Sequence, residues 1–239
     1  MTGLVRPLHP GRADDLACEA AIDLESVQPW LPTVPALAEL LPGRGLRRGA
    51  SYSVEGSTAL ALATLVGASE AGSWCGVVGV PSLGAETAAG LGVDLDRLAL
   101  VPLPGTSWLE VVAALIEAVD IVVVRPPPRV FDADARRLAA RVRQRGAVLV
   151  VLGQWPGCEL RLTVTGSQWT GLGAGHGHLL ARQVTVSTIG RGSAGRPRVA
   201  RLWLPDPDGN IRTVEATPTV GAEPPGDLDR LDALASRAG

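Results

Sequence analysis

The segment at residues 49–60, GASYSVEGSTAL, has the outline of a phosphate-binding P-loop. A working P-loop follows the pattern Gly-x-x-x-x-Gly-Lys-Ser/Thr, in which backbone N–H groups surround the phosphates and the lysine reaches the β- and γ-phosphates. Here Ser51 takes the first glycine position and Gly56 the second, while Ser57 stands at the lysine position and Thr58 at the hydroxyl position. The frame is retained without its positive charge, so the segment predicts a site that no longer handles ATP.

No lysine elsewhere can supply the missing charge, because all 22 basic residues of the chain are arginine. Biased codon usage could equally be the cause of an arginine-only composition. The consequence for the loop is the same, because it has no lysine in either case. Glu55, beside Gly56, would also repel phosphates. Ser57 and Thr58 do not form a nucleophilic pair; we expect them to cap the helix that follows.

The composition indicates one globular domain with appendages. The chain has 239 residues, of which 46% are hydrophobic and 19% charged, with a net charge of −2. That charge argues against a protein whose whole surface binds nucleic acid. Three widely spaced cysteines, Cys18, Cys75 and Cys158, form no zinc ribbon or disulfide framework, and they fit a reducing cytoplasm. Without an apolar leader or a run of about 18 apolar residues, no signal peptide or membrane span is expected.

Apolar segments of strand length alternate with helical patterns in the first two thirds of the chain. Strands are expected at 50–54, 74–80, 97–103, 119–124 and 147–152. Helices are expected at 57–70, 84–91, 106–118 and 132–145. Nearly continuous apolar strands that alternate with helices predict an α/β fold, with a mostly parallel sheet covered by helices on both faces.

After residue 158 the pattern changes to longer segments with alternating polarity. Residues 159–169, 179–190 and 198–204 predict an antiparallel extension at the C-terminal side of the sheet. Three regions follow from these patterns: an N-terminal segment, 1–33, with a short helix over 13–27; a core domain, 34–216; and an acidic Pro/Gly-rich tail, 217–239.

Several segments in a fixed order resemble the core of the RecA recombinase. They are GLRRG at 45–49, GSTALAL at 56–62, LGVDLDRLAL at 91–100, VDIVVV at 119–124 and VTVSTIGRGSAGRPRVARLWL at 184–204. The resemblance covers about residues 34–212 and implies a RecA-like core domain.

The departures from RecA fall on the residues that carry its chemistry. A RecA-type ATPase needs a carboxylate after the strand at 119–124 to hold Mg²⁺, and this position is Arg125. It needs a second acid after the strand at 74–80, and this position is Pro81. With Ser57 in place of lysine, three functions are lost together, so we expect no enzyme activity, no cofactor and no bound metal.

The DNA-binding loops of RecA are also reduced. The first has no room between the strands at 119–124 and 147–152, and the second would fall in 153–179. That stretch contains Trp155 and Trp169, which would stack on bases but are more often core or interface residues.

Among RecA-like proteins, the chain is most similar to the ImuA type in its actinobacterial form, ImuA-prime. These are catalytically degenerate RecA homologues of the damage-inducible (SOS) translesion-synthesis mutasome. The resemblance implies a cytoplasmic adaptor that binds an ImuB-type inactive Y-family polymerase and, through it, an error-prone DnaE-type polymerase and the sliding clamp. Two alternatives stay open: an ATP-independent single-stranded DNA binder, and a SulA-like inhibitor of cell division, since SulA-type proteins share the degenerate fold.

Three groups of residues are candidates for contacts with a partner or with DNA. Two are basic and one is apolar: Arg137, Arg141 and Arg145 on one helix face; Arg196 and Arg198 near a late turn; Leu228, Leu231 and Leu234 in the tail. A solvated helix face is the simpler explanation of the first group. His176 and His178 make a poor metal site, because no cysteine or acid lies close to them.

Overall fold

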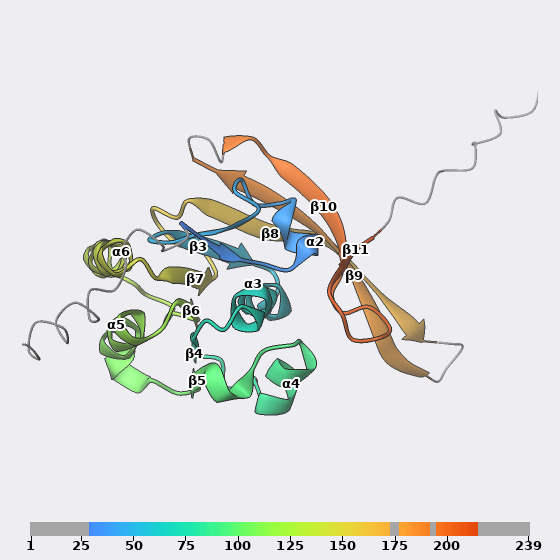
Figure 1. Ribbon diagram of the computed structural model, residues 1–239, viewed down its shortest axis with the longest axis horizontal. Coiled ribbons are helices and arrows are strands. Elements are labelled where there is room, and N and C mark those ends of the chain that lie inside the picture. The colour runs from blue at the N-terminus through green and yellow to red at the C-terminus, as the bar shows by residue number, and fades with distance from the viewer. Residues whose placement is uncertain (1–28, 173–176, 192–194, 215–239) are drawn as a thin grey trace, which may run out of the picture.

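The fold is built on a nine-stranded sheet (Figure 1). The computed structural model describes residues 29–172, 177–191 and 195–214. The strand order is β11-β10-β9-β8-β3-β7-β6-β4-β5. Six neighbouring strands run parallel: β3 (Ser51–Glu55), β4 (Cys75–Val78), β5 (Leu98–Val101), β6 (Ile121–Val124), β7 (Val148–Leu152) and β8 (Leu160–Leu172). The alternation along the sequence therefore predicts the parallel part correctly.

The last strands extend the sheet in antiparallel fashion, as expected. β8 pairs with β9 (Gly177–Gly190), β9 with β10 (Arg198–Trp203), and β10 with the short β11 (Arg212–Thr213). The β8–β9 hairpin reaches well beyond the rest of the sheet (Figure 1). The second RecA-type DNA loop is expected within 153–179, but residues 160–172 form β8; in the described part of this stretch only residues 153–159 form a loop.

Helices cover both faces of the sheet, and the strands show why. On β6, Ile121 and Val123 face one hydrophobic cluster, while Val122 and Val124 face the other. Side chains that alternate in this way bury both faces of a parallel strand. In the first cluster the sheet packs against α3 (Thr58–Glu70) and α4 (Ala85–Gly90). In the second it packs against α5 (Trp108–Ala118) and α6 (Asp132–Arg145).

Helix α3 is buried along most of its length, from Leu60 to Ser69. A helix that is apolar all round needs cover on its outer side as well. The cover comes from the N-terminal part of the core, where β1 (Trp30–Pro32) pairs with β2 (Gly45–Arg47) and α2 (Pro35–Ala38) lies between them. Gly67 allows the close approach, since a Cβ there would lie 2.5 Å from the backbone of Thr33.

Two short 3₁₀ helices lead into β5 and α5; they are Leu95–Arg97 and Gly105–Ser107. None of the helices in the described ranges is long and apolar enough to span a membrane.

Candidate functional site

The P-loop-like segment is a strand followed by a very short turn. β3 continues to Glu55, and α3 begins at Thr58, so only Gly56 and Ser57 connect them. The structure thus corrects the position of Ser51, which is not in a loop. It is the first residue of β3, at the other end of the strand, where it pairs with Leu149 of β7 and its carbonyl accepts from the N–H of Glu159 just before β8. The connection lacks the length to surround a phosphate with backbone N–H groups.

The remaining turn residues have clear structural roles. Gly56 has a φ of +84°, a conformation that glycine adopts without strain. Ser57 is the N-cap of α3, and its Oγ accepts a hydrogen bond from the backbone N–H of Leu60 at 3.2 Å. The expected capping role of Ser57 is confirmed, whereas Thr58 is already the first helical residue.

Arg125 occupies the position at which a RecA-type ATPase would hold Mg²⁺. It follows β6 directly, and its Nη2 donates a hydrogen bond to Thr58 Oγ1 at 2.7 Å. Its backbone is fixed as well, because its N–H donates to the carbonyl of Val78 on β4 at 2.9 Å. The hydroxyl that would bind a metal ion is therefore held by a cation, which disfavours a second positive charge there.

A second guanidinium reaches the turn from the β8–β9 hairpin. Arg182 Nη1 lies 3.4 Å from Ser57 Oγ, and Arg182 Nε donates to Ser167 Oγ at 2.8 Å. Its guanidinium carbon also lies 5.5 Å from the ring centroid of Trp169, within range of a cation–π interaction. Three contacts orient Arg182 toward the position that a P-loop lysine would occupy.

The acid beside the turn is paired rather than free. Glu55 Oε1 lies 3.2 Å from Arg161 Nε on the neighbouring strand β8. The negative charge of Glu55 is thus partly neutralised, and its expected repulsion of phosphates is weaker than the sequence alone suggests.

A polar cavity of about 320 Å³ remains above the turn. Its lining includes Gly56, Ser57, Thr58, Arg125 and Gly153. Gly153 is held in place by Ser53, whose Oγ donates to the Gly153 carbonyl at 2.6 Å. Among the residues that the structure describes, no carboxylate lines this cavity, and no cluster of three His, Cys, Asp or Glu residues is suited to a metal ion.

An apolar cavity of about 410 Å³ adjoins the polar one through Thr58. It lies between α3, α4 and the turn at 205–209, with Leu62, Leu83 and Leu91 in its lining. Pro81 itself follows β4 with its ring exposed, and its neighbours Val80 and Ser82 line the same cavity. At the expected position of the second catalytic acid, the protein therefore has an apolar surface.

Of the three arginines expected to share a face of α6, two contact α5. Arg141 lies 3.7 Å from Glu117, and Arg145 donates to the backbone carbonyl of Glu117 at 2.9 Å. Arg137 lies 4.0 Å from Asp134 on its own helix. Arg141 and Arg145 therefore join two helices, which is a local structural role. Two other arginines of α6, Arg136 and Arg143, line open cavities.

The second expected basic group divides in the structure. Arg198 Nη1 donates to the backbone carbonyls of Leu41 at 2.7 Å and Glu39 at 3.1 Å, so it secures the turn after α2 and is not a free contact residue. Arg196 is exposed. Leu228, Leu231 and Leu234 lie outside the described residues, as does His176, and the side chain of His178 is not described.

The two tryptophans considered for base stacking also differ. Trp155 is only 2% exposed and packs in the cluster with α5 and α6, which is the core role judged more common. Trp169 is 49% exposed on the hairpin beside Arg182.

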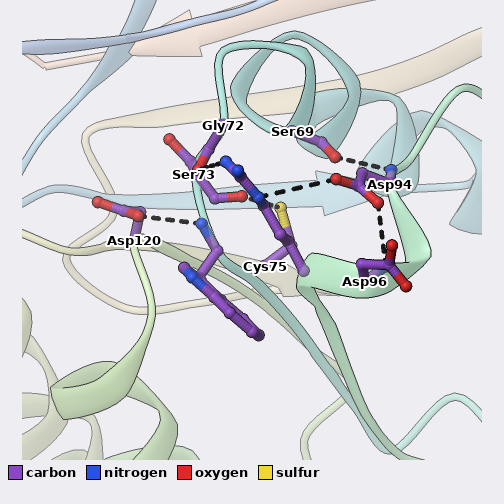
Figure 2. A network of polar contacts seen from close by, with 9 residues as sticks. Ser69, Gly72, Ser73, Cys75, Asp94, Asp96 and Asp120 are labelled. Atoms are coloured by element: carbon purple, nitrogen blue, oxygen red, sulfur yellow. Dashed lines mark hydrogen bonds and ion pairs between the residues drawn. The ribbon is translucent and has the colours of Figure 1, made fainter.

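The RecA-like segment LGVDLDRL forms a structural turn (Figure 2). Asp94 caps the 3₁₀ helix by accepting from the N–H of Asp96 at 3.0 Å, and its own N–H donates to Ser69 Oγ at 2.8 Å. Arg97 donates to the carbonyl of Gly72. These contacts tie the C-terminal end of α3 to the start of β5, at the opposite end of α3 from the turn at Gly56.

Arg182 was not identified from the sequence. Its strand lies 125 residues beyond Ser57, and nothing in the spacing links the two. The feature that identifies Arg182 is its position on β9 directly opposite Trp169 of β8, which places both side chains on one face of the hairpin.

Two comparisons connect this chain to known sequences. Residues 39–157 match the model of the MT3502 N-terminal domain. A stretch of 111 residues is 40% identical to the uncharacterized protein Rv3395c of Mycobacterium tuberculosis, covering 46% of this chain and 54% of the relative. The chain thus spans about half the length of the curated relative that it matches. The matched domain contains β3, the shortened turn and Arg125.

Proposed function

We propose that this protein is a non-catalytic RecA-like adaptor of the ImuA type, which binds an ImuB-type protein in damage-inducible translesion synthesis. The observation that carries the proposal is the hydrogen bond from Arg125 to Thr58. It replaces the oxygen-rich metal site of an ATPase with a guanidinium, while the α/β scaffold around it is kept intact.

The shape of the degenerate site supports a structural use for it. The turn is too short for a phosphate, and Arg125, after β6, and Arg182, on β9, bond to its Thr58 and Ser57. A scaffold that keeps its core and rigidifies its former reaction centre is suited to binding other proteins. The relative in Mycobacterium tuberculosis comes from an actinobacterium, the group whose ImuA-type proteins the sequence resembles.

Co-purification with the ImuB-type protein of the same genome tests the proposal. We expect stable co-elution of the full chain, and absence of co-elution by a folded chain would overturn the adaptor function. A chain that ends near residue 216 would then tell whether the tail is required for the interaction.

The apolar cavity offers a second site for the same experiment. Thr87 lines it, whereas Ala89 on the same short helix is exposed and does not. If the partner uses this cavity, Thr87→Glu weakens co-elution and the matched variant Ala89→Glu does not. Equal binding by both variants would place the interface elsewhere.

One observation favours single-stranded DNA binding as a second candidate. Trp169 is about half exposed and has the guanidinium of Arg182 beside its ring, an arrangement on which a base can stack. Titration with an oligonucleotide at low salt would quench tryptophan fluorescence, and Trp169→Ala would remove the effect. Trp74, which is 51% exposed and lies far from Trp169 in the sequence, provides the control variant Trp74→Ala.

A further inference from the structure

A basic groove lies at the end of the sheet opposite the degenerate turn. Two adjoining cavities, of about 470 and 460 Å³, share Ala139, Arg143, Gly157 and Arg191. They lie over the amino-terminal ends of β3 and β8, beside α6. We call this surface the arginine groove; it is lined by Trp30, Arg47, Arg136, Arg143, Cys158 and Arg191.

Most of the positive charge in the groove has no partner among the residues that the structure describes. Arg47 is bonded to Glu159, but Arg136, Arg143 and Arg191 make no ion pair within the described ranges. Asp132 and Glu159 are the acids in its lining. The groove therefore carries an excess of guanidinium groups, which favours an anionic occupant.

The backbone brings the groove close to α6 and to the N-terminal chain. Gly49 has a φ of +77°, and a Cβ there would lie 3.4 Å from the Cα of Arg143, so α6 packs directly on this turn. On the opposite wall, the ring of Trp30 lies over Gly43, where a Cβ would come within 2.5 Å of it. The carbonyl of Pro29 accepts from the N–H of Arg48, which fixes the point where the preceding chain reaches the groove.

The segment that ends at this point is strongly acidic. Residues 13–27, ADDLACEAAIDLESV, contain five acids and no basic residue. If the segment forms the helix that its sequence predicts, Asp15, Glu19 and Asp23 follow an i, i+4, i+8 spacing and form one stripe. Leu16, Ala20 and Leu24 form an apolar stripe beside it, which matches a groove with both arginine and tryptophan walls.

We propose that the arginine groove binds the acidic segment 13–27 of the same chain. The connection is long enough: the 12 residues from Cys18 to Trp30 span about 18 Å as a helix and about 40 Å when extended. Acidic side chains of the segment then pair with Arg143 and Arg191. This inference does not depend on the adaptor function and concerns a different surface.

The cysteines of the natural chain provide the test. Cys18 lies in the acidic segment, Cys158 lines the groove, and Cys75 is 0% exposed in the core. The full-length protein is treated at low salt with a short bismaleimide, and the products are mapped by mass spectrometry. We expect an intrachain Cys18–Cys158 bridge that is lost at high salt, because screening weakens exposed charge pairs. Cys75 should stay unmodified.

Charge reversal makes the test specific to the groove. Arg143→Glu with Arg191→Glu should abolish the bridge, while Arg137→Glu with Arg141→Glu, on the same helix but outside the groove lining, should leave it. Reversing Asp15, Glu19 and Asp23 to arginine in the first variant should restore it. Circular dichroism confirms that each variant is folded.

Three results would overturn the proposal. One is separate modification of Cys18 and Cys158 in the wild-type chain without a bridge between them. Another is an equal yield of bridge in the variant with Arg143 and Arg191 reversed. The third is a bridge formed only between two chains and lost on dilution, which would assign the groove to a second copy.

Discussion

Arg125 at the end of β6 donates a hydrogen bond to Thr58 Oγ1 at the start of α3, over 2.7 Å. Under the proposed RecA-like assignment, the two residues correspond to positions that share one metal ion in an ATPase. Here a direct bond between the side chains joins the strand to the helix. The contact is local, but it bears on which substitutions could restore an ATPase site here.

Restoring the three lost side chains should not restore ATP hydrolysis. The variant Ser57→Lys, Arg125→Asp, Pro81→Glu supplies the charge and both acids, yet only Gly56 and Ser57 link β3 to α3. Backbone N–H groups that surround the phosphates are still missing. Phosphate release by this variant should equal the background, as it should for the wild type. Hydrolysis by the triple variant would instead mean that side chains alone had silenced the site.

Removal of the helix cap should lower stability measurably. Ser57→Ala removes the Oγ that accepts from the N–H of Leu60, and we expect a loss of about 1 kcal/mol in the free energy of unfolding. Urea denaturation measures it. Ser57→Asp keeps an acceptor and adds a charge near Arg182, so its stability should match or exceed the wild type. Equal stability of the alanine and wild-type proteins would show that the cap contributes nothing.

Two glycine substitutions should have opposite effects. Gly67→Ala places a methyl group 2.5 Å from the backbone of Thr33, and overpacking of this kind costs about 1–3 kcal/mol. Gly90→Ala meets no atom within 4 Å at the end of α4, so it should be neutral or stabilising by up to about 1 kcal/mol. Thermal unfolding of both variants compares them directly. If Gly67→Ala is tolerated, β1 does not cover α3 as described.

Stability should fall at alkaline pH. Burial raises the pKa of the Cys75 thiol from 9.0 to about 12. Between these values the unfolded chain releases the proton and the folded protein retains it, so the free energy of unfolding decreases as pH rises from about 9 to about 12. The slope for one such group is at most about 1.4 kcal/mol per pH unit.

A variant that lacks only the Cys75 thiol isolates this effect. Cys75→Ala loses some packing energy at every pH but should show a shallower decline above pH 9, measured by urea denaturation in a pH series. Burial also raises the pKa of Tyr52, so part of the decline should persist above its ordinary pKa of 10.0. Identical slopes for the wild type and Cys75→Ala would contradict the assignment.

The sequence predicts most elements because their signals are local. Helix α6 is found at the expected bounds, 132–145, since Asp132 and Asp134 mark its start and Gly146, with a φ of +72°, its end. Apolar strands such as β6 and β7 are equally clear from their burial on both faces.

The predictions failed where hydrogen bonds between distant segments decide the structure. The strand expected at 50–54 is confirmed as β3, but the P-loop frame that begins at Ser51 is not, because β7 and β8 pair with this strand on both sides and keep it extended. The basic side chains show the same limit. From the sequence, Arg141 and Arg198 are basic residues suited to a binding surface. In the structure Arg141 pairs with Glu117 and Arg198 bonds to the carbonyl of Leu41, and tertiary packing determines both partners.

The position of β3 in the sheet has a consequence for synthesis of the chain. Ser53 lies beside Val151 on one side and Arg161 on the other, so both neighbours of this central strand are made about 100 residues later. During translation one edge of β3 stays unpaired until β7 is made, and the other until β8 has left the ribosome. A fragment cut at residue 157, the end of the matched domain, lacks β8 and leaves the second edge unpaired. The stretch from 158 onward is therefore needed for orderly folding of the first half, and expression of the shorter fragment alone should lead to aggregation.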